Sequence, residues 1–193
     1  MSSARLLGGG ALVLGVLAVV AGSPHRSGRG VDIHTLAREV TDETDHVTAV
    51  ELARWIRDRK PSLRVIDVRD SSDFEEYHIP RAERIPLDRL VDTPFQPGET
   101  IVLYSGGGAH AAQGWVFLRS RGLTRVYFLR GGVDEWLDEV MNPQLPSNVR
   151  PSERSYLDSV AALSRYFGGT PRQVDSILPI VRSTVARARG RGC

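Results

Sequence analysis

The sequence predicts an α/β fold in which a parallel sheet is flanked by helices on both faces, with an N-terminal apolar helix and a helical C-terminal extension. Short apolar runs such as 63–68 and 101–104 are typical of buried strands, and amphipathic segments alternate with them. Strands that alternate with helices form parallel sheets. The 41% content of hydrophobic residues is enough for a packed core and too high for general disorder.

The individual elements follow from periodicity and capping signals. Residues 31–44 carry apolar side chains at helical spacing. Thr48 and Glu51 form a capping box for a helix that extends to Arg59. The further elements expected are a strand at 63–68, a short helix within 71–77, a turn at 78–80, an extended segment at 85–87, a strand at 101–104, a helix at 111–121, a strand at 126–128 and a helix at 133–140.

Four segments are expected along the chain. Residues 1–22 are a signal peptide or membrane anchor, because an apolar run at 6–22 follows Arg5. Residues 23–45 form a linker and short helix, 46–141 the α/β domain, and 142–193 a helical extension with a basic tail. The first segment predicts an extracytoplasmic protein, periplasmic or secreted, that associates with the membrane through residues 6–22.

Charge identifies no partner. The net charge is +2, and the tail 185–193 carries three arginines without an acid, which is typical of a solvated terminus. Nucleic acid is disfavoured as a partner, because no aromatic residue lies among those arginines. The only cysteine, Cys193, forms no internal disulfide. No cofactor or metal site is indicated, since His34 and His46 are isolated from other ligands.

A glycine loop between the strand at 101–104 and the next helix is the candidate site. It starts at Ser105, and the residues expected to bind a ligand are Gly106, Gly107, Gly108, Ala109 and His110. Such a loop directs backbone N–H groups and a helix N-terminus at one spot, which favours an anion or a thiolate. It follows its strand at the edge where open α/β sheets bind ligands.

Three motifs in order carry a resemblance to the rhodanese domain, the fold of thiosulfate and persulfide sulfurtransferases. Residues 65–69 read Val-Ile-Asp-Val-Arg, Asp73-Phe74 precedes His-Ile-Pro at 78–80, and residues 129–136 contain Gly-Gly before a tryptophan. The resemblance covers about residues 47–139. Tyr77 and Arg81 stand where the family motif has glycines.

The resemblance implies roles for the loop residues. Ser105 takes the position of the catalytic cysteine, Gly106 that of a first basic residue, Gly108 that of the glycine, and His110 that of a second basic residue. It also implies that Arg69 aids anion binding, although an ion pair with Asp67 is an equal alternative. Because a persulfide does not form on a serine oxygen, the resemblance implies a pseudoenzyme.

Three functions remain open. The preferred one is a catalytically inactive binding or regulatory module for a small oxyanion or an acidic protein group. Hydrolysis by Ser105 with His110 as base is disfavoured, since no Gly-x-Ser-x-Gly pattern is present. The second is a sulfurtransferase that uses Cys193 or a partner's cysteine. The third is a membrane-associated assembly protein whose C-terminal helix docks a partner through Tyr156, Leu157, Val160, Leu163 and Phe167, although the same residues are expected to pack on the domain itself.

Overall fold

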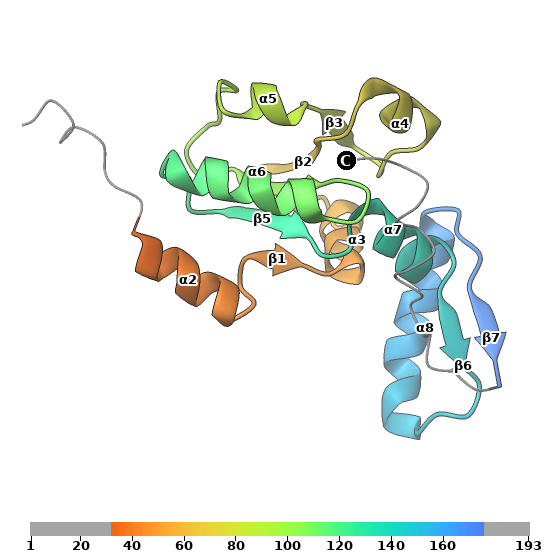
Figure 1. Ribbon diagram of the computed structural model, residues 1–193. Helices are drawn as coiled ribbons and strands as arrows, with labels where there is room; N and C mark the ends of the chain where they lie inside the picture. The colour runs from red at the N-terminus through yellow and green to blue at the C-terminus, as the bar shows by residue number, and fades with distance from the viewer. Residues whose placement is uncertain (1–31, 176–193) are drawn as a thin grey trace, which may run out of the picture.

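A computed structural model describes residues 32–175, which form a five-stranded parallel sheet with the strand order β1-β5-β4-β2-β3 (Figure 1). Every strand pair in this sheet is parallel. The predicted α/β class and the parallel sheet are therefore confirmed. The strands are β1 His46–Val47, β2 Leu63–Asp67, β3 Ala82–Arg84, β4 Thr100–Tyr104 and β5 Val126–Leu129.

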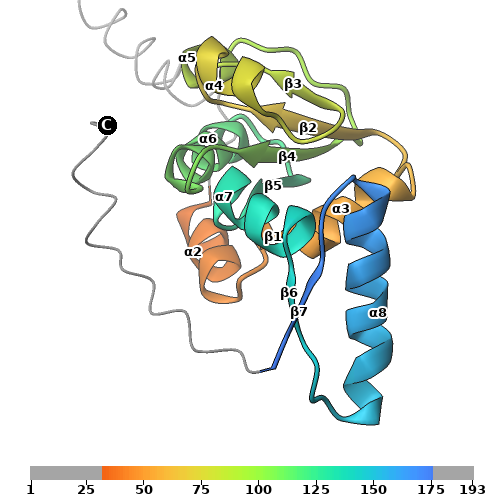
Figure 2. The same ribbon diagram turned by 90° about the vertical axis from the view of Figure 1, so that its right-hand side faces the viewer.

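Helices cover both faces of this sheet (Figures 1 and 2). The helices α3 and α7 contribute to one apolar cluster, and α5 and α6 contribute to a second cluster on the other face. The helices are α2 Ile33–Thr41, α3 Ala49–Arg57, α4 Ser71–Glu76, α5 Leu87–Leu90, α6 Ala109–Ser120, α7 Gly132–Trp136 with a π-helical turn at Leu137–Met141, and α8 Pro151–Tyr166.

The central strand β4 shows why the sheet needs helices on both sides. Its alternate residues Val102 and Tyr104 lie in the first cluster, while Ile101 and Leu103 lie in the second. All four are at most 1% exposed. Successive side chains of a strand point to opposite faces, so an apolar run without alternation requires a cover on each face.

Helix α3 begins as predicted and ends two residues early. The Thr48 hydroxyl accepts a hydrogen bond from the Glu51 N–H at 3.2 Å, which satisfies a donor of the first turn. At the other end, Arg59 has a φ of +52° and donates its N–H to the Ile56 carbonyl at 3.2 Å. Lys60 donates to Trp55 at 2.9 Å, so the backbone turns away from the helix at this point.

The structure differs from the expected elements of the domain in three details. The segment 85–87 is not extended throughout, because the third strand is Ala82–Arg84 and Leu87 already begins α5. The short strand β1 was not expected; it pairs with β5, which lies about eighty residues later in the sequence. Helix α6 begins at Ala109 rather than at 111, because Gly108 at its N-cap has a φ of +93°.

The C-terminal extension is helical only in part. Helix α8 is present, but Arg172–Val174 forms strand β7, so the expectation that 142–193 is helical is wrong for these residues. Strand β7 pairs in parallel with β6, Gln144–Pro146, and both strands run beside α8 (Figure 2). Gly168, with a φ of +79°, reverses the chain after α8, and Arg172 N–H then donates to the Pro143 carbonyl at 2.9 Å.

Helix α8 packs on the domain. Val160 and Leu163 are 6% and 2% exposed and belong to the same apolar cluster as Trp136. Phe167, just after the helix, lies edge-on to Trp136 with the ring centroids 5.2 Å apart. Tyr156 remains 53% exposed, so only part of the predicted apolar face is buried against the domain.

The predicted N-terminal apolar helix at 6–22 and the basic tail with Cys193 lie outside the described residues. Between residues 32 and 175, no helix has the length and apolar character required to cross a bilayer.

Candidate functional site

The glycine loop lies where the sequence predicts it, between the carboxyl end of β4 and the first turn of α6. Ser105 is buried at 3% exposure, and Gly106 is half-buried. The side of the loop formed by Gly107, Ala109 and His110 is exposed to solvent. A ligand can therefore reach the backbone of this loop directly from solvent.

Helix α7 holds the carbonyl groups of this loop. Val133 N–H donates to the Ser105 carbonyl at 2.9 Å, and Asp134 N–H donates to the Gly106 carbonyl at 3.3 Å. The approach is so close that a Cβ atom on Gly132 would lie 2.2 Å from both carbonyl oxygens. Glycine is thus required at position 132 by steric exclusion.

The same contacts determine where the loop's N–H groups point. In a trans peptide the C=O and the following N–H point in opposite directions, so the N–H groups of Gly106 and Gly107 point away from α7. Neither N–H has a hydrogen-bond acceptor among residues 32–175. Successive free N–H groups next to a helix N-terminus form a concavity that favours an anion.

Among the residues that the structure describes, no base activates the Ser105 hydroxyl. Its Oγ accepts a hydrogen bond from the Gly108 N–H at 3.2 Å. No hydrogen bond joins it to a histidine or carboxylate in the described part of the chain, and His110 is exposed on the first turn of α6. Within the same residues, no three histidine, cysteine or carboxylate side chains gather as metal ligands.

The three glycines of the loop differ in how strictly they are required. Gly108 has a φ of +93°, and a Cβ atom there would lie 3.3 Å from the Gly131 nitrogen. A Cβ atom at Gly106 or Gly107 would meet no atom within 4 Å. Gly108 therefore shapes the loop, whereas Gly106 and Gly107 leave open space in front of it.

Arg69 is held in an ion pair beside the loop's strand. Its Nε lies 2.9 Å from Asp67 Oδ1, and its Nη2 lies 2.6 Å from Asp67 Oδ2. Nη2 also donates to the Tyr77 carbonyl at 2.7 Å. Burial alone lowers the pKa of Arg69, but the hydrogen bonds and charge of Asp67 outweigh burial and raise that pKa. The guanidinium is therefore held by Asp67, as in the ion-pair alternative.

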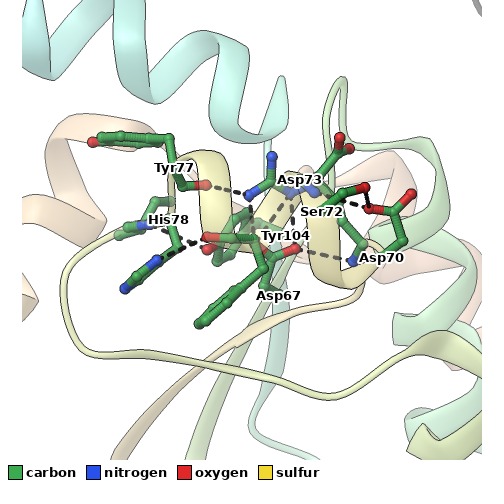
Figure 3. Close-up of polar contacts among 10 residues, drawn as sticks. Asp67, Asp70, Ser72, Asp73, Tyr77, His78 and Tyr104 are labelled. Atoms are coloured by element: carbon green, nitrogen blue, oxygen red, sulfur yellow. Dashed lines mark hydrogen bonds and ion pairs between the residues drawn. The ribbon is translucent and has the colours of Figure 1, made fainter.

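Tyr77 and Arg81 stand at the two positions where the family motif has glycine, and their backbone conformations differ. Tyr77 has a φ of −162°, an extended conformation that any residue adopts, and its hydroxyl accepts a hydrogen bond from Trp136 Nε1 at 2.8 Å. Arg81 has a φ of +68° and does occupy a conformation that favours glycine. His78 lies just before the turn, which spans residues 79–82 rather than the predicted 78–80, and its Nδ1 is 2.9 Å from the Phe74 carbonyl oxygen (Figure 3).

Two cavities lie away from the glycine loop, and neither was predicted as a site from the sequence. One, of about 500 Å³, lies between α8 and the strands β6 and β7. The other, of about 560 Å³, is lined by Arg59 and Arg81 together with the end of α8. The one sequence signal for the second cavity was an arginine at a glycine position of the motif.

Comparison with known proteins identifies the class of the domain. Residues 48–139 match the family model of the rhodanese-like domain. This stretch, which contains the sheet from β2 to β5 and the glycine loop, is therefore a rhodanese-like domain.

Curated relatives share this domain and are mostly longer. The chain is 30% identical over 89 residues to a protein named tRNA sulfurtransferase from Thermoplasma acidophilum, covering 46% of this chain and 18% of that protein. It is 32% identical over 75 residues to the uncharacterized protein YqhL from Bacillus subtilis, covering 38% of this chain and 60% of that protein. A protein named tRNA uridine(34) hydroxylase from Caulobacter vibrioides is 26% identical over 135 residues, which cover 58% of this chain and 41% of that protein. The chain thus spans less than two thirds of each relative.

Among solved structures, the protein SSP1007 from Staphylococcus saprophyticus is 30% identical, with 48% of this chain and 92% of that chain covered and a TM-score of 0.44. The rhodanese-like domain of the Alr3790 protein from Anabaena is 29% identical, with 48% of this chain and 72% of that chain covered and a TM-score of 0.45.

Proposed function

We propose that this rhodanese-like domain is catalytically inactive in sulfur transfer and acts as a regulatory module that binds a small oxyanion or an acidic group of a partner protein at the loop 105–110. The observation that carries the proposal is the pair of N–H groups on Gly106 and Gly107 that have no acceptor among residues 32–175, next to a serine hydroxyl that is bonded to no histidine or carboxylate within the same residues. The loop retains the donors that hold an anion.

The lack of sulfur transfer follows from the chemistry of Ser105. By its resemblance to active sulfurtransferases, the chain has this serine at the position of the nucleophilic cysteine. Sulfane transfer requires a thiolate that forms a persulfide, and a hydroxyl has a far higher pKa than a thiol. Gly106, at the position of a basic residue, supplies no charge for a thiosulfate dianion.

The proposal includes a location at the membrane or outside the cytoplasm. It is supported by the apolar run at 6–22, which follows a single positive charge at Arg5. An alkaline phosphatase fusion after residue 45 tests it in a bacterial host: high phosphatase activity supports export, and activity equal to that of a fusion lacking residues 6–22 contradicts it.

Anion binding at the loop is tested by calorimetric titration of the full chain with thiosulfate, sulfite and phosphate. A Gly107→Asp variant is the control, because the position has room for a side chain and a carboxylate there repels an anion. We expect at least tenfold weaker binding by the variant. Equal affinity in both proteins would remove the loop as the binding site.

The proposal that Ser105 prevents sulfur transfer is tested by placing a cysteine at this position. A Ser105→Cys variant, alone and with Gly106→Arg, is treated with thiosulfate and examined by mass spectrometry. Position 106 accepts a Cβ atom, because no atom lies within 4 Å of one built there. We expect a mass increase of one sulfur atom at position 105 in the variants and none in the parent protein.

A second candidate is a sulfurtransferase that borrows its thiol from Cys193 or from a partner protein. The name of the Thermoplasma acidophilum relative, tRNA sulfurtransferase, favours it. Turnover of thiosulfate and cyanide by the purified full chain, lost on Cys193→Ser, would support this candidate. Turnover that survives Cys193→Ser without any helper protein would contradict both candidates.

A further inference from the structure

A second site lies where α8 meets the rhodanese-like domain. The cavity there has a volume of about 560 Å³. Its lining comes from the end of α3, the turn before β3 and the end of α8, through Ile56, Arg59, Pro80, Arg81, Tyr166 and Phe167. Because Arg59 precedes β2 and Arg81 precedes β3 in a parallel sheet, the cavity lies at the amino edge of the sheet, opposite the glycine loop.

Two arginines of this cavity have a backbone conformation that favours glycine. Arg59 has a φ of +52° directly after α3, at the position where helices usually place glycine. Arg81 has a φ of +68° in a turn closed by the Ala82 N–H and the Ile79 carbonyl at 3.0 Å, where the third residue is normally glycine. Non-glycine residues in this conformation are strained, and such strain clusters at ligand-binding sites.

The charges of both arginines are available to a ligand. Neither guanidinium has a hydrogen bond or an ion pair with any residue from 32 to 175. The nearest acid in sequence, Asp58, is held by Arg57 at 2.8 Å. This contrasts with Arg69 and Arg119, which are paired with Asp67 and Glu39.

The rest of the lining is aromatic and apolar. Tyr166 is 60% exposed, and its ring lies edge-on to Phe167 with the centroids 4.9 Å apart. Ile56 and Pro80 complete the apolar wall. An exposed aromatic face beside two cations suits a ligand that combines a planar ring with a negative charge.

We propose that this cavity binds a small molecule in which an oxyanion is attached to an aromatic ring, with the oxyanion held by Arg59 and Arg81 and the ring packed on Tyr166. Aryl phosphates are the simplest members of this class. A guanidinium pair matches the oxygens of a phosphate, and the ring excludes water from the apolar wall.

Phenyl phosphate titrated into the full chain, followed by calorimetry, tests the proposal. Every protein in this titration carries Gly107→Asp, which removes the proposed anion site of the loop. The result therefore tests the cavity alone and does not depend on whether the loop binds an anion. We expect phenyl phosphate to bind at least tenfold more tightly than inorganic phosphate or phenol. We also expect at least a tenfold loss of affinity in the double variant Arg59→Gly and Arg81→Gly, and in Tyr166→Ala.

The glycine substitutions also separate a ligand-binding role from a structural one. Glycine relieves the positive φ at both positions, so the Tm of the double variant is expected to equal or exceed that of the parent. Arg89→Gln, at an exposed arginine whose contact with Asp88 is 3.8 Å long, should leave the affinity unchanged. Unchanged affinity in the double variant, or a fall in its Tm, would overturn the proposal.

Discussion

Backbone conformation at single residues shapes the glycine loop. Gly108 adopts a positive φ and lies against the Gly131 nitrogen, while Gly132 lies against the carbonyl oxygens of Ser105 and Gly106. Neither close approach leaves room for a Cβ atom without movement of the backbone. The direction of the loop's N–H groups, and with it the proposed anion site, depends on these two glycines.

A Gly108→Ala substitution should lower the free energy of unfolding by about 1–2 kcal/mol, because alanine is strained at a φ of +93°. Urea denaturation measures the change. Gly107→Ala is the matched control; its Cβ meets no atom within 4 Å, so we expect a change within about 0.5 kcal/mol. Equal effects of the two substitutions would contradict the assigned role of Gly108.

Asp67 and Arg69 form a mostly buried ion pair, which is the second feature at the scale of single residues. The Asp67 side chain is fully buried, and that of Arg69 is 11% exposed. The buried Tyr104 ring lies beneath the arginine, 5.6 Å from ring centroid to guanidinium carbon. Burial and the neighbouring charge of Asp67 both raise the pKa of Tyr104, so its hydroxyl stays neutral.

Asp67→Asn should destabilise the protein by roughly 2–3 kcal/mol, because it leaves a mostly buried guanidinium without a counter-charge. Chemical denaturation at neutral pH measures this value. The control is Asp88→Asn, which breaks an exposed 3.8 Å pair with Arg89 and is expected to cost less than about 0.5 kcal/mol. A loss at Asp67 no larger than at Asp88 would contradict a structural role of the buried pair.

At the scale of whole elements, side-chain caps determine where the short helices start. Thr48 caps α3, and the Asp70 carboxylate caps α4 by accepting a hydrogen bond from the Asp73 N–H at 2.9 Å. The Ser72 hydroxyl donates to the same carboxylate oxygen at 2.8 Å (Figure 3). The Asp73 N–H and then the Ser72 hydroxyl lower the pKa of Asp70.

The cap of α4 predicts a dependence of stability on pH. Because the pKa of Asp70 is lower in the folded than in the unfolded protein, its stabilising contribution is complete above the unfolded pKa. The contribution is lost as the pH falls through the folded pKa. The difference in unfolding free energy between the parent and Asp70→Ala should therefore be constant near neutral pH and shrink in acid. A difference independent of pH would contradict the charged cap.

On the scale of the whole molecule, α8 completes the core on one face of the domain. The family match ends at residue 139, yet Val160 and Leu163 lie in the same cluster as Trp136 and Val140. The extension is thus packed against the domain and forms one wall of the cavity that contains Arg59 and Arg81.

Leu163→Ala should cost about 2–4 kcal/mol, because it removes a side chain that is 2% exposed from this shared cluster. Thermal or chemical denaturation measures the loss. Val116→Ala is the control, since Val116 is 43% exposed and its truncation is expected to cost under about 1 kcal/mol. Truncation after Val140 should lower the Tm as well, and an unchanged melting curve would show that α8 does not stabilise the domain.

Most of the fold and the position of the glycine loop were predictable because their signals are local. Apolar runs identified β2, β4 and β5, and the capping box at Thr48 identified the start of α3. Strand β1 was missed because two residues are too few for a periodic pattern. Strand β7 was missed because only its pairing with β6 makes Arg172–Val174 extended.

The sequence by itself determined the parallel α/β class, the rhodanese-like motifs and the serine at the start of the loop, since each depends on neighbouring residues. Only the tertiary structure decided how that loop is oriented, because its carbonyl groups are held by α7, which follows the neighbouring strand β5. It also decided that Arg59, Arg81 and Tyr166 line one cavity. Residues so far apart in the chain meet only through packing, which no local pattern records.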